Sequence, residues 1–162
     1  MMKQLAPAQS LVLSRRGFIR IAGIAFGVAA ANSLVACAPA SREPEMRIVY
    51  PGQGARVPSA QVSVQVEVRN FRLVRPGAPR PGEGHLHFFI DVPASAVADG
   101  EIIPLDQTDK FVHLGTPPFT TRTLTLSPGI HTITAVMADG THAKLPIPRP
   151  VSVTFFAQPP GA

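Results

Sequence analysis

The 162-residue chain contains no tryptophan, one tyrosine and a single cysteine, Cys37. With one cysteine, no disulfide can form within the chain. If Cys37 is consumed by modification, thiolate catalysis and a blue-copper site with a Cys ligand are also excluded. The sequence further lacks a nucleophile elbow, a phosphate-binding loop and a spacing of paired carboxylates. We therefore expect a protein that is not an enzyme.

Acidic residues are missing from the first 37 positions, whereas four of the 15 basic residues lie there. The formal net charge of +5 belongs largely to that segment, because the eleven Lys and Arg that follow it are offset by ten Asp and Glu. Nucleic-acid binding requires a clustered basic face. The nearly neutral remainder excludes nucleic acid as an expected partner.

Helical periodicity is also scarce. The chain has 18 proline and 13 glycine residues, and its Val, Ile and Thr residues fall into short runs bounded by turns. Strands are predicted over 46–51, 61–68, 82–92, 110–114, 119–126, 130–138 and 151–156, and more weakly over 71–74. Seven to eight short strands with frequent turns are typical of an immunoglobulin-like antiparallel β-sandwich, which we place at 46–158.

Alternation of apolar and polar residues assigns one face of each strand to the core. In the 61–68 strand, the valines at even positions share one face and polar residues share the other. The predicted interior consists of Val62, Val64, Val66, Leu86, Phe88, Ile90, Leu124, Leu126 and Ile133.

The first 36 residues have the features of an export signal. The sequence SRRGFIR at 14–20, with Arg15 and Arg16, matches the twin-arginine pattern. The apolar run at 21–36 is too short for a comfortable transmembrane helix. It ends in LVAC, which resembles the lipobox of bacterial lipoproteins. That resemblance implies cleavage before Cys37, lipidation of its thiol and a tether at 37–45.

The lipoprotein reading places the protein in the cell envelope, anchored to a membrane by lipid after passage through the twin-arginine machinery. In a Gram-negative cell this means the periplasmic side, and the absence of Asp after the cysteine favours the outer membrane. Two alternatives remain open. One is an amphipathic N-terminal helix with a buried Cys37; the other is cleavage at Ala38-Pro39-Ala40, which would release a soluble protein.

The stretch at 82–92, GEGHLHFFIDV, predicts a strand that carries two histidines on one face. Because side chains alternate, His85 and His87 point the same way and lie about 7 Å apart. The opposite face, from Leu86 to Val92, is entirely apolar. Two imidazoles at this spacing can share one metal ion, and Asp91 lies in phase to ligate the ion or orient a ring.

Further ligands must come from other elements. His142, just after the Asp139-Gly140 turn, is the first choice, since the strand ending there would neighbour the His strand in an immunoglobulin-like order. His113 is a weaker candidate. His131 occupies the position where such domains carry a corner tyrosine, so a structural role competes with ligation.

Imidazole ligands without a thiolate suit copper or zinc. Met46 and Met137 offer soft ligand atoms, although the phase of Met137 favours core packing. Ligation requires neutral imidazoles, so binding should weaken as pH falls below the ordinary His pKa of about 6.5.

From Gly82 to Phe156 the chain resembles an uncharacterised family of small exported β-sandwich proteins, known only as a domain of unknown function. The resemblance rests on GxGHxHxxID at 82–91, on PGxH at 128–131 and on the histidine that follows the AD turn at 138–142. His113 lies in KFVHLG, where such proteins often have a His-Phe/Leu-Gly pattern. The resemblance implies an immunoglobulin-like fold and export, and no established activity comes with it.

The sequence favours two functions over a third, an enzyme with a metal ion bound by histidines, for which no general base or substrate pocket is visible. The first is an exported lipoprotein that binds copper or zinc through histidines and acts as a carrier or buffer in the cell envelope. The second is an immunoglobulin-like interaction or scaffold module that contacts an envelope protein and whose histidines are structural.

Overall fold

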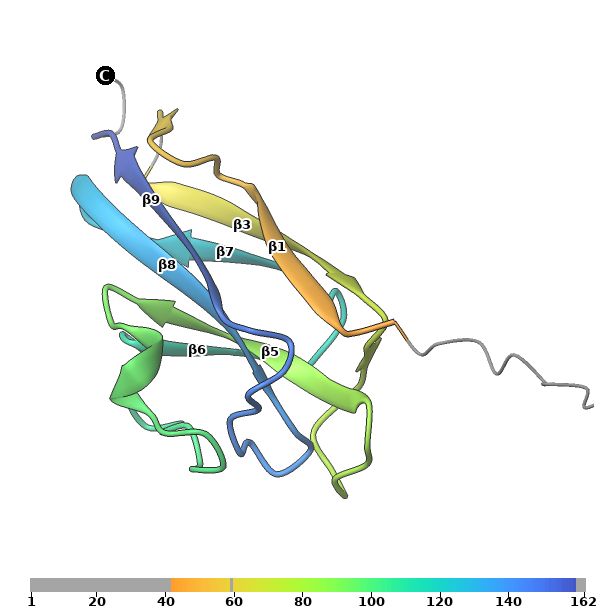
Figure 1. The fold of residues 1–162 in the computed structure, drawn as a ribbon. Helices are drawn as coiled ribbons and strands as arrows, with labels where there is room; N and C mark the ends of the chain where they lie inside the picture. Colours follow the sequence, from red (N-terminus) through yellow and green to blue (C-terminus); the bar gives the residue numbers. More distant parts are fainter. Residues whose placement is uncertain (1–41, 59, 160–162) are drawn as a thin grey trace, which may run out of the picture. The chain divides into compact units, whose positions relative to one another are not determined.

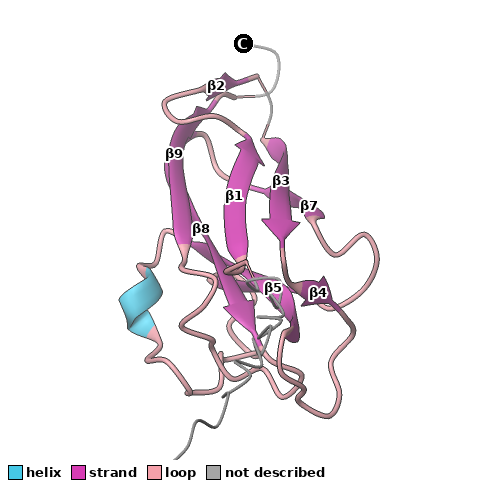
Figure 2. Cartoon of the chain, turned by 45° about the vertical axis from the view of Figure 1, so that its right-hand side comes forward, coloured by secondary structure: helices cyan, strands magenta, loops and turns pink. Residues whose placement is uncertain are grey.

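The computed structural model describes residues 42–58 and 60–159. The export signal with Arg15 and Arg16, and the lipidation site Cys37, lie outside the described residues. Within them, the one helix is a 3-10 turn, Ala94–Ala96, and no helix is long and apolar enough to cross a membrane (Figure 2).

The described residues form an antiparallel β-sandwich with two sheets (Figure 1). The smaller sheet has the order β1-β3-β7, and the larger has the order β9-β8-β5, with β6 paired to β5. Two very short strands pair in parallel with the larger sheet, β2 with β9 and β4 with β5. The bounds are β1 Glu45–Tyr50, β2 Arg56–Val57, β3 Gln61–Arg69, β4 Arg72–Leu73, β5 Glu83–Ile90, β6 Phe111–Leu114, β7 Thr121–Thr125, β8 Gly129–Ala138 and β9 Val151–Ala157.

This strand order is the immunoglobulin-like one, as the sequence predicted. Seven described strands have four residues or more, and consecutive strands repeatedly change sheets, so that both inner faces contribute to one core. The predicted interior residues are buried in this core, except Ile90, which packs against its edge. Met46 and Met137 also belong to the core, which leaves them no place in a ligand set.

The strand that carries the histidines is buried on both faces, which the alternation of its residues did not predict. Leu86 and Phe88 enter the core between the sheets. On the outer face, Phe89 packs in a second apolar cluster with Ile103 and Phe111, under the connection that runs over 93–109. His85 and His87 therefore have no solvent-exposed surface, although they lie on the outer face of the sheet.

A buried lysine fixes the covering connection. The Nζ atom of Lys144 donates to the carbonyl oxygens of Ala94 and Val97 at 2.7 and 2.8 Å, and lies 3.1 Å from an oxygen of Asp99. Backbone hydrogen bonds also join Glu101 and Ile103 to the segment after β8. Because lysine is normally exposed, its sequence position gave no indication of this role.

Candidate metal centre

Four histidines from three segments meet at one end of the larger sheet. His85 and His87 lie on the same face of β5, and His113 on β6 is the direct cross-strand partner of His87. His142 comes from the turn after β8, which is the other neighbour of β5. One ring nitrogen from each of the four lies within 4.8 Å of those from the other three. The structure thus brings together four of the six residues that the sequence nominated as ligands.

Three of the ring nitrogens form a tight triangle. The Nε2 atom of His85 lies 3.0 Å from Nδ1 of His142 and 3.2 Å from Nε2 of His87, and the third side is 3.5 Å. Nitrogens bound tetrahedrally to zinc at 2.0–2.1 Å are about 3.3 Å apart. The three nitrogens therefore have the spacing at which they could hold one such ion together.

Hydrogen bonding alone cannot satisfy this triangle. Each nitrogen carries either a hydrogen or a lone pair, so at least two of the three are of the same kind, and their contact is repulsive. A central cation removes the conflict because all three nitrogens can then present lone pairs. The Nδ1 atoms of His85 and His87 and the Nε2 atom of His113 are buried and find no hydrogen-bond partner among the described residues.

Burial favours the neutral form of His85, His87 and His113. Loss of hydration, with the positive charges of His113 and His142 as further causes, lowers the pKa of His85 to about 4. Burial and the other three histidines lower the pKa of His87 to about 2. Burial also lowers the pKa of His113, helped by His142 and Arg122. The pKa values of His85 and His87 thus lie below the ordinary value of about 6.5 from which the sequence predicted a weakening of metal binding.

Gly115 makes room for the His113 ring. A Cβ atom at this glycine would lie 2.2 and 2.3 Å from Cε1 and Nε2 of His113. Any side chain at position 115 must therefore displace the imidazole. The sequence signal was the glycine two residues after the histidine, but its meaning depends on how the ring folds back over the chain.

A short turn holds His142 in place. Oδ1 of Asp139 accepts hydrogen bonds from the backbone N–H groups of Thr141 and Ala143 and from the Thr141 hydroxyl. Burial raises the pKa of Asp139, but these hydrogen bonds outweigh it, and the net pKa is lowered. His142 itself has a left-handed backbone with φ of 70°. The carbonyl oxygen of Gly140 accepts a hydrogen bond from the N–H of Gly77 at 2.9 Å. A Cβ atom at Gly140 would lie 2.4 Å from the carbonyl oxygen of Gly77, so a side chain does not fit at this position.

Asp91 and His131 do not join the cluster. Asp91 follows the last residue of β5, six positions from His85 and thus about 20 Å away along the strand. Its φ of 55° ends the alternation and directs the carboxylate toward the start of β8. There, Oδ2 lies 2.7 Å from Nδ1 of His131, and Oδ1 accepts from the N–H of Thr132. The in-phase position of Asp91 was misleading for this reason.

His131 fills the corner position that the sequence indicated. Its Nε2 lies 2.8 Å from the carbonyl oxygen of Ser127, so that both ring nitrogens face acceptors. The Ser127 hydroxyl is 3.5 Å from the same Nε2. Although Ser, His and Asp are aligned, Nε2 donates to the carbonyl and has no lone pair with which to activate the hydroxyl. The three residues therefore have a structural role, in which His131 links Asp91 after β5 to Ser127 before β8.

Comparisons with known proteins describe the domain but not its activity. Residues 64–155 match the model of a family described as a domain of unknown function, DUF4399. No curated protein matches. A crystal structure of an engineered protein aligns with 74% of this chain and 21% of its own, at 20% identity and a TM-score of 0.43. Fibronectin(III)-like modules of Clostridium thermocellum CbhA align over 70% of this chain and 96% of theirs, at 11% identity and a TM-score of 0.41.

Proposed function

The chain belongs to the DUF4399 family, a domain of unknown function, and we propose that this member is an exported lipoprotein that holds a copper or zinc ion. His85, His87 and His142 would bind the ion, with His113 as a fourth ligand. The protein would act as a non-enzymatic carrier or buffer in the cell envelope.

The observation that carries the proposal is the nitrogen triangle, with sides of 3.0, 3.2 and 3.5 Å. Its size fits the ligand spacing of a small metal ion, and its donors are the imidazoles that copper and zinc accept. Two of the ligands sit on a central strand and are fixed by the sheet on both sides. Such a site is largely formed before an ion arrives.

The alternative function, a scaffold module with structural histidines, accounts for His131 but not for the cluster. His131 has an acceptor for each ring nitrogen. In the cluster, three ring nitrogens lie 3.0, 3.2 and 3.5 Å apart, and at least two of them must both carry hydrogens or both carry lone pairs. A purely structural role leaves this repulsion in place, whereas an ion bound by all three nitrogens removes it.

The cellular location in this proposal rests on the sequence. Arg15 and Arg16 precede a weakly apolar run that ends in LVAC at 34–37. If the protein is exported folded, replacing both arginines by lysine should abolish export in cell fractionation. Mass spectrometry of the mature protein should show a chain that starts at Cys37 and carries acyl groups. A lipid-free terminus at Ser41 would contradict the anchor.

Calorimetric titration of the purified protein with Cu²⁺ and with Zn²⁺ tests the metal site directly. We expect one ion per chain for the wild type. His87→Gln should weaken binding strongly because it removes one of the three nitrogens of the triangle, while an amide of similar size preserves the packing.

His131→Asn is the matched control, because it also removes one imidazole but from a place outside the cluster. Its metal stoichiometry and affinity should match the wild type. If the wild type binds neither ion, or if His87→Gln binds as tightly as the wild type, the metal-binding function is wrong and the scaffold function stands.

A further inference from the structure

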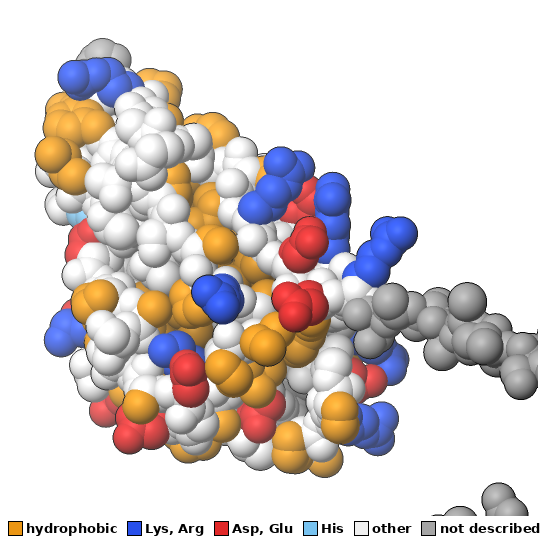
Figure 3. Space-filling view, in the orientation of Figure 1, with side chains coloured by type: hydrophobic (Ala, Val, Ile, Leu, Met, Phe, Trp, Pro, Cys, Tyr) orange, Lys and Arg blue, Asp and Glu red, His pale blue; other side chains and the backbone are white. Residues whose placement is uncertain are grey.

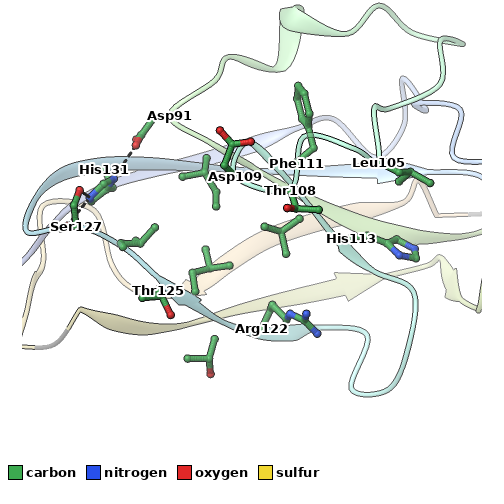
Figure 4. A pocket seen from close by; sticks show the side chains of 15 residues that line it. Asp91, Leu105, Thr108, Asp109, Phe111, His113, Arg122, Thr125, Ser127 and His131 are labelled. Atoms are coloured by element: carbon green, nitrogen blue, oxygen red, sulfur yellow. Dashed lines mark hydrogen bonds and ion pairs between the residues drawn. The ribbon is translucent and has the colours of Figure 1, made fainter.

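A groove of about 710 Å³ opens between the edge strands of the two sheets. Within the described part of the chain, β6 pairs only with β5, and β7 only with β3, so the groove separates two free strand edges. Asp91, Ser127 and His131 gather at one end (Figure 4). His113 lies at the other end, and Arg122 projects from the facing strand toward it.

His113 connects this groove to the metal centre. It is the one member of the four-histidine cluster that also lines the groove. His85 and His87 are fully buried, whereas His113 and His142 are partly exposed. The cluster therefore borders the groove on its His113 side.

The charges around the cluster leave a bound cation poorly balanced. Imidazole binds a metal ion through a lone pair, so the four histidines would bring no negative charge, and the carboxylate of Asp139 acts on His85. Arg122 adds a positive charge beside His113 and forms no ion pair with any of the described residues. A divalent ion bound by the buried His85 and His87 would add a positive charge in a region of low dielectric constant, where an unbalanced charge is costly, and the exposed Arg122 adds no negative charge to offset it.

We propose that the end of the groove between His113 and Arg122 binds a small anion of the carboxylate type, which adds to the coordination of the metal ion. This inference rests on the proposed metal-binding function. The guanidinium group presents several N–H donors in a plane and matches a carboxylate in shape and charge. The anion's other oxygen would face the ion from the His113 side.

Binding of azide to the Cu²⁺-loaded full-length protein provides the test, since an anion bound to copper produces a charge-transfer absorption band. Acetate should displace azide if the site takes carboxylates. Arg122→Ala should weaken azide binding about tenfold, the effect of losing one charged hydrogen bond. Arg122→Lys should retain part of the affinity because it keeps the charge.

Arg149→Ala is the matched control, since it removes the same charge from an exposed loop away from the groove. It should bind azide within twofold of the wild type. Equal azide affinity in Arg122→Ala and the wild type would overturn the inference, as would copper-loaded protein that shows no azide band. In both cases the metal-binding function would stand. Failure of copper itself to bind would overturn both.

Discussion

Acidification should destabilise the metal-free protein through two buried histidines. The folded state holds the pKa of His85 at about 4 and that of His87 at about 2, whereas both are near 6.5 in an unfolded chain. Between these values the unfolded chain binds more protons than the folded one, so the free energy of unfolding must fall as pH falls. This loss begins near pH 6.5, the unfolded value, and continues down to each folded pKa.

The magnitude follows from the same shifts. At pH 5 each histidine is protonated in the unfolded chain and neutral in the folded chain, which costs about 2 kcal/mol per residue relative to pH 7. Together they remove about 4 kcal/mol, a large share of the 5–15 kcal/mol typical of a domain. The midpoint of thermal unfolding should therefore drop by roughly 15 °C.

Thermal unfolding between pH 7 and pH 5, followed by circular dichroism with a chelator present, measures the effect. The carboxyl groups whose pKa is lowered, those of Glu67 and Asp139, contribute mainly below this window. A His85→Gln/His87→Gln variant should lose most of the pH dependence and keep the part that comes from His113, whose pKa is also lowered by burial. A wild-type midpoint that changes by less than about 3 °C, or an equal slope in the double variant, would refute the reasoning.

Three further changes separate the site from the scaffold. Gly115→Ala should weaken metal binding in calorimetry with little loss of fold, because its methyl group would occupy the space of the His113 ring. Phe88→Ala should cost about 3–5 kcal/mol in urea unfolding, since Phe88 is fully buried in the core. Asp91→Asn should lower the free energy of unfolding by about 1–2 kcal/mol because it weakens the contact with Nδ1 of His131, and it should leave metal affinity unchanged. An Asp91→Asn variant with impaired metal binding would show that the two sites are coupled.

The fold was largely accessible from the sequence because period-two alternation and turn residues are local properties. Seven predicted strands match described strands within two residues at each end. The segment over 71–74 contains a strand of only two residues, β4, and the two-residue strand β2 was not predicted. A strand of two residues is too short to show an alternating pattern in the sequence. The order of the strands came from the general rules of immunoglobulin-like sandwiches, not from any single residue.

Local sequence patterns could not predict that the histidine strand is buried on both faces. The covering layer comes from the connection over 93–109, which has no periodicity and is fixed by Lys144 and by backbone pairing with the chain after β8. The face seen in Figure 3 shows almost no histidine surface, and its basic and acidic side chains are interspersed. That burial produces the low pKa values of the cluster, so the pH behaviour of the site also could not be predicted.

The correct placement of His85 and His87 on one face and the incorrect placement of Asp91 have one physical origin. Alternation places side chains correctly only while the backbone stays extended. The two histidines lie within β5, where this holds, but Asp91 has a left-handed backbone that carries its carboxylate toward His131. His142 is left-handed too, yet its turn brings the ring back over the neighbouring strand. The relative position of two side chains inside one strand can thus be predicted from spacing, whereas that of a side chain beyond a strand end depends on the dihedral angles of the turn.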